Sequence, residues 1–169
     1  VELRLNGRSL GVKKNSSDPK SRDKIRWDGI VYEPGTLLAI ARNSGKEVAR
    51  HEITTAGPLK RLALIPDNET WKADGQDLMH IRVLGLDAKG RRTPLANDTL
   101  TVRVSGPAEL VAADNGDITG NAISTDPTTS LYQGNLLVIL RATPKPGKVR
   151  VELVDKAGRV RGKCTLATK

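Results

Sequence analysis

Three oxygen-bearing side chains lie within four positions of each other in the segment Asp114-Asn115-Gly116-Asp117. Clustered carboxylate and amide oxygens are the ligands that hard cations such as Ca²⁺ prefer. The segment lacks the spacing and the closing glutamate of an EF-hand loop, and a tight Asn-Gly turn accounts for the same residue types. We therefore expect a polar turn at this point, without a metal ion.

Side chains suited to acid–base or nucleophilic catalysis are scattered along the chain. His51 and His80 fall in strand-like segments without a second ligand at metal-binding spacing. Cys164 is the only cysteine, so no internal disulfide can form, and we expect it to be a small apolar core residue. The chain contains neither a glycine-rich phosphate loop nor a Gly-x-Ser-x-Gly elbow. The sequence thus predicts no catalytic residue, no metal and no cofactor.

Aromatic residues are scarce, since the chain has two Trp, two Tyr and no Phe. Modules that bind sugars or single-stranded nucleic acids usually stack them on exposed aromatic rings. By analogy with sandwich packing, Trp27 is expected to lie in a core between two sheets. If an aromatic residue contacts a glycan, Trp71 and Tyr132 are the candidates.

The chain of 169 residues is basic, with a formal net charge of +9. The excess is distributed, because residues 1–57 carry +4 and residues 58–169 carry +5. A basic surface favours anionic partners such as nucleic acids or acidic glycans. No recognition helix and no aromatic-basic interleaving accompany the charge, so we expect no nucleic-acid partner. No run of 18 apolar residues is present, so we expect no membrane insertion.

The elements that would position these residues are short strands in two modules. Gly57-Pro58 interrupts the strand pattern, because proline lacks a backbone N–H and glycine has no side chain to pack. We therefore expect one module in residues 1–57 and a second in residues 58–169. The first shows about five strands, one of them alternating through Ile25 and Trp27, whereas an immunoglobulin-like sandwich needs about seven. It is expected to lack its N-terminal strands, and the chain to be a fragment of a longer protein.

The second module has turn signals about every 8–12 residues, which is the spacing of an all-β sandwich. Residues 135–143 form its most apolar segment and are expected to be a strand buried on both faces. No helical period is sustained in the chain. The predicted fold class is therefore all-β, with two consecutive immunoglobulin-like β-sandwich domains.

Several segments of the chain, taken in order, resemble the C-terminal immunoglobulin-like domains of bacterial family 2 glycoside hydrolases, especially β-galactosidase-like enzymes. In the first module they are residues 1–11, Trp27, Tyr32-Glu33-Pro34-Gly35-Thr36-Leu37, Gly45-Lys46-Glu47-Val48-Ala49 and Thr55-Ala56-Gly57-Pro58. In the second they are Ala73-Asp74-Gly75 with Asp77-Leu78, Asp87-Ala88-Lys89-Gly90, Val104-Ser105-Gly106-Pro107, Asp114-Asn115-Gly116-Asp117 and residues 132–141. Residues 118–122 depart from the proline-containing loop that is usual in the family.

The resemblance implies a non-catalytic accessory region that packs against the catalytic barrel and other domains of a parent enzyme and helps to shape its active-site rim or its oligomer. In this family the two catalytic glutamates lie on the barrel, and no segment here matches their motifs; Glu33 is a turn residue. An accessory-domain loop that leans towards the barrel mouth would make Asp114, Asn115 and Asp117 candidates for the substrate rim. A periplasmic or extracellular location in a bacterium is expected.

Two other functions remain open at this stage. Tandem immunoglobulin-like modules also build bacterial surface adhesins, which would carry further similar modules in series. A stand-alone carbohydrate-binding module would bind glycans without the rest of an enzyme. Fold alone does not distinguish these functions.

Overall fold

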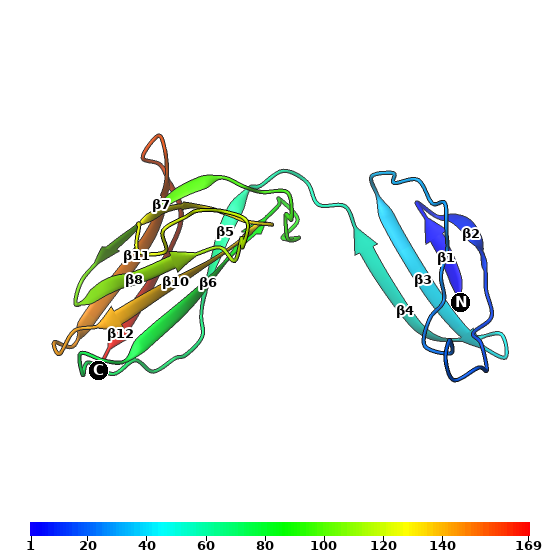
Figure 1. Ribbon diagram of the computed structural model, residues 1–169, viewed down its shortest axis with the longest axis horizontal. Helices are drawn as coiled ribbons and strands as arrows, with labels where there is room; N and C mark the ends of the chain where they lie inside the picture. Colours follow the sequence, from blue (N-terminus) through cyan, green and yellow to red (C-terminus); the bar gives the residue numbers. More distant parts are fainter. The chain divides into compact units, whose positions relative to one another are not determined.

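The computed structural model describes residues 1–169, and it is built of strands β1 to β12 joined by turns and loops (Figure 1). The chain divides into two compact units, Val1–Thr55 and Ala56–Lys169. The predicted all-β class is confirmed. No helix of the kind that could cross a membrane is present.

The first unit is a single antiparallel sheet with the strand order β2-β1-β3-β4. Its strands are β1 (Glu2–Leu5), β2 (Arg8–Val12), β3 (Thr36–Asn43) and β4 (Lys46–Thr54). Asn6 and Gly7 have φ angles of 52° and 82°, as the tight hairpin turn between β1 and β2 requires. One sheet is half of a two-sheet sandwich, which agrees with the expectation of an incomplete first module.

Residues 13–35 contain no strand, so the predicted strand through Ile25 and Trp27 is wrong. Trp27 is only half-buried, and it does not lie between two sheets because this unit has only one. The Nζ of Lys13 lies 5.6 Å from the centroid of its ring, within the range of a cation–π interaction. Apolar and polar residues alternate around Ile25 and Trp27, but the segment forms no strand because no neighbouring strand pairs with it.

The second unit is a sandwich of two four-stranded sheets, with the orders β5-β6-β10-β8 and β12-β11-β7-β9 (Figure 1). All neighbouring strands are antiparallel. The strands are β5 (Arg61–Pro66), β6 (Leu78–Leu86), β7 (Thr99–Ser105), β8 (Ala108–Asp114), β9 (Thr128–Ser130), β10 (Asn135–Ala142), β11 (Gly147–Asp155) and β12 (Val160–Thr168). This is the immunoglobulin-like architecture that the turn spacing predicted.

The core of the second unit lies between its two sheets and consists of alternate residues of their strands. Ile81, Val138 and Val151 are fully buried there, at 0% exposure. Cys164 on β12 is half-buried and packs against this core, and its burial raises the pKa of the thiol.

Within residues 1–169, strand β10 is buried on one face only, whereas the sequence pattern predicted burial of both faces. Leu136, Val138 and Leu140 face the core, whereas Leu137 and Ile139 point away from it and are half-exposed. Side chains alternate between the faces of a strand, so an apolar run alone does not show what covers each face.

Candidate functional site

The antiparallel pairing of β10 with β6 and β8 brings several predicted residues to one end of the second unit. Asn135 pairs with Leu84 near the end of β6, and Leu137 pairs with Asp114 at the end of β8. The Nδ2 of Asn115 donates to the backbone carbonyl of Ser130 at 2.9 Å, two residues before Tyr132. We call residues 87–98, 114–127 and 131–135 the loop end.

The rim candidates form a turn whose polar atoms bond mainly to the turn itself. The carboxylate of Asp114 accepts from the Gly116 N–H at 2.8 Å and from the Ser124 hydroxyl at 2.9 Å. The Oδ1 of Asn115 accepts from the Asp117 N–H at 2.9 Å. These bonds fix the shape of the turn and leave few free acceptors for a ligand.

Asp117 is the most available carboxylate of this turn. Its Oδ1 accepts from the hydroxyl and the N–H of Thr119, at 2.7 and 3.0 Å, whereas its Oδ2 makes no side-chain hydrogen bond. The bonds from Thr119 lower the pKa of Asp117, so the group stays ionised at neutral pH. Nowhere in the chain do three His, Cys, Asp or Glu side chains gather as a metal site would require. Asp117 can therefore accept a hydrogen bond from a ligand hydroxyl, but it is unsuited to donate a proton.

Tyr132 is an exposed aromatic side chain at the same loop end, with 37% of its surface exposed. Its backbone N–H donates to the Asn135 carbonyl at 3.0 Å, which closes the turn before β10. Arg92 donates to the Oδ1 of Asn135 at 2.7 Å. The Nδ2 of Asn135 donates to the carbonyls of Tyr132 and Gln133, so the amide is engaged within the turn. The partly exposed ring of Tyr132 is the feature of this turn that a sugar could contact.

Trp71, the other glycan candidate, lies at the opposite end of the sandwich. Only 2% of its surface is exposed, and its indole N–H donates to the Asp77 carbonyl at 3.0 Å. The backbone of Trp71 also accepts from Lys169 at 2.9 Å, which ties it to the end of β12. The structure corrects this candidate: Trp71 is a core residue and offers no ring face to a sugar.

Sequence reasoning missed the importance of Asp87, which it assigned only to a turn. Asp87 is 1% exposed and accepts hydrogen bonds from the N–H groups of Gly57, Lys89 and Arg91 and from the guanidinium of Arg91. These hydrogen bonds lower the pKa of Asp87, and the bond from the Gly57 N–H makes the largest contribution. Asp155 and Arg159 repeat the pattern in a second Asp-x-x-Gly-Arg turn. This internal repeat was the sequence signal that could have revealed both turns.

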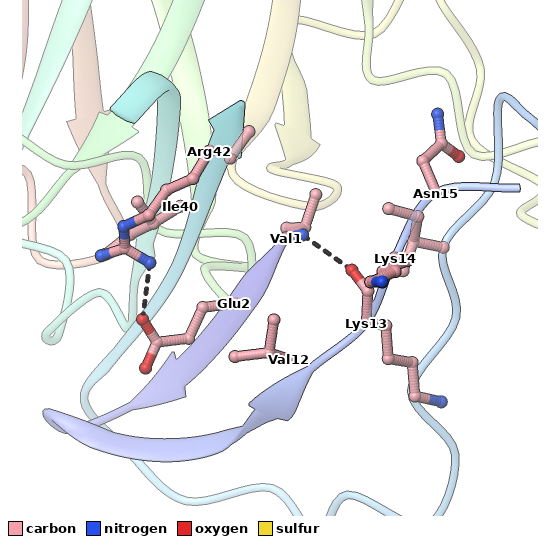
Figure 2. A pocket seen from close by; sticks show the side chains of 10 residues that line it. Val1, Glu2, Val12, Lys13, Lys14, Asn15, Ile40 and Arg42 are labelled. Atoms are coloured by element: carbon pink, nitrogen blue, oxygen red, sulfur yellow. Dashed lines mark hydrogen bonds and ion pairs between the residues drawn. The ribbon is translucent and has the colours of Figure 1, made fainter. Parts of the chain in front are cut away.

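A pocket on the first unit is lined by residues at the paired ends of β1, β2 and β3 (Figure 2). Glu2 and Arg42 point toward one another there, with 2.9 Å between Oε2 and Nη1. Arg4 bonds the other carboxylate oxygen at 2.9 Å. The bonds from Arg4 and then Arg42 lower the pKa of Glu2 to about 2. Glu2 is therefore an ionised structural group without a proton to donate.

The carboxyl groups whose pKa values are clearly shifted lack the property that a glycosidase acid requires. A general acid in glycoside hydrolysis needs a raised pKa so that it keeps its proton. Every carboxyl pKa that clearly departs from its ordinary value is lowered, namely those of Glu2, Glu47, Asp74, Asp87, Asp117 and Asp155. The electrostatics of the chain therefore favour a structural role for these groups.

Comparison with known protein families gives two matches along the chain. Residues 62–163 match the family described as glycoside hydrolase family 2 C-terminal domain 5. Residues 1–49 match a family described as a domain of unknown function. The first match covers the core strands of the second unit together with the loop end.

Individual proteins show the same similarity. A β-galactosidase of Bacteroides ovatus is 37% identical over 89% of this chain, and the match covers 17% of that protein. A β-glucuronidase of Formosa agariphila is 32% identical over 64% of this chain and 11% of its own length. A solved family 2 glycosyl hydrolase from Bacteroides cellulosilyticus superposes with a TM-score of 0.90 at 28% identity, over 99% of this chain and 21% of the other. The chain thus spans about a fifth or less of the length of these relatives.

Proposed function

We propose that this chain, which belongs to the C-terminal domains of family 2 glycoside hydrolases, is a non-catalytic accessory region that packs against its parent enzyme and stiffens it. The observation that carries the proposal is the match of residues 62–163 to a C-terminal domain family, together with relatives of which this chain covers only 17% and 21%. The similarity does not favour the adhesin or the stand-alone carbohydrate-binding module.

The electrostatics support the non-catalytic part of this proposal. Hydrolysis by two carboxyl groups needs one that holds a proton and a second ionised group about 5–10 Å away. The clearly shifted carboxyl pKa values are all lowered, and Glu2 and Asp87 are held by arginine side chains and by N–H groups. The catalytic pair of the parent enzyme would then lie outside residues 1–169, on a barrel that builds the substrate site.

A second role is proposed for the loop end, as part of the rim of the active site. Asp117 keeps one carboxylate oxygen without a side-chain hydrogen bond, and Tyr132 exposes part of its ring. Asp114 and Asn115 would act indirectly in this role, because their side chains hold the turn in shape. A glycan that reaches beyond the barrel would contact Asp117 and Tyr132.

For the parent enzyme we propose a β-galactosidase-like activity and a periplasmic or extracellular location in a bacterium. The activity is suggested by the name of the Bacteroides ovatus relative, and the Formosa agariphila relative makes β-glucuronides the competing substrate class. Assays of the full-length protein with chromogenic β-galactosides and β-glucuronides would separate the two. Cell fractionation with antibodies against this region would test the location.

The central experiment compares the full-length parent protein with a form that ends at Thr55. We expect the full-length protein to hydrolyse a β-glycoside, and the shortened form to lose thermal stability and part of its activity. The 169-residue chain alone is expected to hydrolyse no glycoside. A gene that encodes further immunoglobulin-like modules and no barrel would overturn the proposal in favour of an adhesin. Glycan binding by the isolated chain at millimolar ligand would favour a binding module.

A further inference from the structure

The outer face of the sheet β5-β6-β10-β8 is unusually apolar for a surface of a two-layer sandwich. Outward-facing positions of such a fold normally carry polar residues, which alternate with the core positions. Here Leu137 and Ile139 face outward from β10 and are half-buried, in addition to the buried core residues of the same strand. Strand β10 is therefore apolar on both sides, although only one side has a sheet packed against it.

Neighbouring strands extend this apolar face through their pairing register. Ile139 stands opposite Ala112 of β8, and Leu84 of β6 stands opposite Ala63 of β5. Two larger apolar side chains of the same face are exposed to solvent, Ile65 at 38% and Leu78 at 43%. We call this surface the outer apolar face, and it consists of Ala63, Ile65, Leu78, Leu84, Ala112, Leu137 and Ile139.

The outer face of the other sheet is different and serves as an internal comparison. Pairing places Arg103, Glu152 and Lys163 in one row across β7, β11 and β12. The next row holds Ser105, Arg150 and Thr165. These residues are polar or charged, as expected for a face in water. The apolar character is therefore specific to one sheet, and exposed apolar patches of this kind mark contact surfaces.

The charges on the outer apolar face indicate what would cover it. Arg82 is exposed on β6 between Ile65 of β5 and Leu137 of β10, and it makes no ion pair within the chain. On the same face His80 is paired with Asp67 and Arg141 with Glu109, whereas Arg61 at the start of β5 makes no ion pair, like Arg82. A matching surface would be apolar and would present a carboxylate to Arg82.

We propose that the outer apolar face docks on a domain of the same polypeptide that lies outside residues 1–169, through an apolar surface with a carboxylate opposite Arg82. The inference rests on the proposed accessory function and names the surface through which it acts. Relatives of the chain carry about four-fifths or more of their length beyond the matched region, which provides such a domain within one polypeptide. Docking in one polypeptide needs no high affinity, because the linked partner is present at a high effective concentration.

Cysteine labelling tests directly whether the face is covered. In a Cys164→Ala background, Ile65→Cys and Leu137→Cys report on the outer apolar face, and Thr165→Cys reports on the polar outer face of the other sheet. Each variant is made in the full-length protein and in the 169-residue chain, and its reaction with a maleimide is timed. We expect the two face positions to react about tenfold or more slowly in the full-length protein, because labelling then requires local opening. Thr165→Cys should react equally in both.

Equal labelling rates at Ile65→Cys and Leu137→Cys in the two proteins would overturn the proposal. Slow labelling of these two positions in the 169-residue chain itself would also overturn the proposal. If that slow rate depended on protein concentration, the face would be covered by a second copy of the chain.

Arg82→Glu is a second probe, which changes only an exposed side chain. This variant should lower the melting temperature of the full-length protein and leave that of the 169-residue chain unchanged. A parent protein without glycosidase activity would refute the proposed function, whereas the labelling result would still decide whether the face is covered.

Discussion

Gly57 donates its backbone N–H to the Oδ2 of Asp87 at 2.9 Å, across 30 positions of the sequence. The bond attaches the Gly-Pro segment at the start of the second unit to the turn that follows β6. Asp87 also holds that turn through Lys89 and Arg91. One buried carboxylate thus organises both the entry of the chain into the second unit and the first of its two Asp-x-x-Gly-Arg turns.

The first prediction separates these two roles of Asp87. Asp87→Ala leaves three backbone N–H groups and the Arg91 guanidinium without their acceptor, and we expect the melting temperature of the second unit to fall by about 5–10 °C. Asp155→Ala is the control, because Asp155 holds its own turn, and an ion pair with Arg161 at 3.6 Å, without a bond to Gly57. It should lower the melting temperature by a smaller amount. Equal losses in calorimetry would show that the bond to Gly57 contributes nothing.

The second prediction concerns acid sensitivity of the first unit. The pKa of Glu2 is about 2 in the folded chain against an ordinary value of 4.5. Because the folded value is the lower one, ionised Glu2 stabilises the fold fully above about pH 4.5, and this contribution is lost as the pH falls towards 2. Glu2→Gln should therefore be less stable than the wild type at pH 6, and the difference should shrink by pH 3.

Urea titrations followed by the NMR amide signals of β1 and β3 would measure this effect in the first unit alone. Glu52→Gln on β4 is the control, since Glu52 is exposed and forms no ion pair. Glu52→Gln should leave the stability at pH 6 close to that of the wild type, because it removes no ion pair. A difference between Glu2→Gln and the wild type that stays constant from pH 6 to pH 3 would contradict the role of Glu2.

The third prediction compares two glycines at the loop end. Gly116 and Gly134 both have positive φ angles, 76° and 71°. A Cβ on Gly116 would meet nothing within 4 Å, whereas one on Gly134 would lie 2.3 Å from the Thr93 carbonyl oxygen. Gly116→Ala should thus cost only the backbone strain of about 1 kcal/mol. Gly134→Ala must also displace backbone, so we expect a loss of about 3 kcal/mol or more. Chemical denaturation of both variants would test this, and equal losses would contradict it.

The fourth prediction addresses the proposed rim role of the loop end. If Tyr132 contacts substrate, Tyr132→Ala in the full-length parent should raise KM by about three- to tenfold, as expected for the loss of one aromatic contact. Leu95→Ala is the control. Leu95 lies in the same loop end and is 93% exposed, but it is not one of the proposed substrate contacts. Steady-state assays of both variants would decide, and an unchanged KM for Tyr132→Ala would remove it from the rim.

The sequence by itself determined the local elements of this protein. Period-two alternation in residues 1–5 and 100–105, and Gly- or Pro-containing turns between strands, were sufficient to predict an all-β chain, because these signals depend on neighbouring residues only. The ordered motifs also identified the family resemblance. Alternation failed at Ile25 and Trp27, where no partner strand is available to pair with the segment.

Tertiary structure alone decided burial and long-range contacts. It placed Trp71 in the core and Tyr132 at the surface, although the sequence treated both as equal candidates. It showed that residues 1–169 cover only one face of β10, and it joined Gly57 to Asp87. The physical reason is the same in each case: the sequence pattern records which faces of a strand are apolar, whereas their coverage depends on strand pairing and packing between residues far apart in the chain.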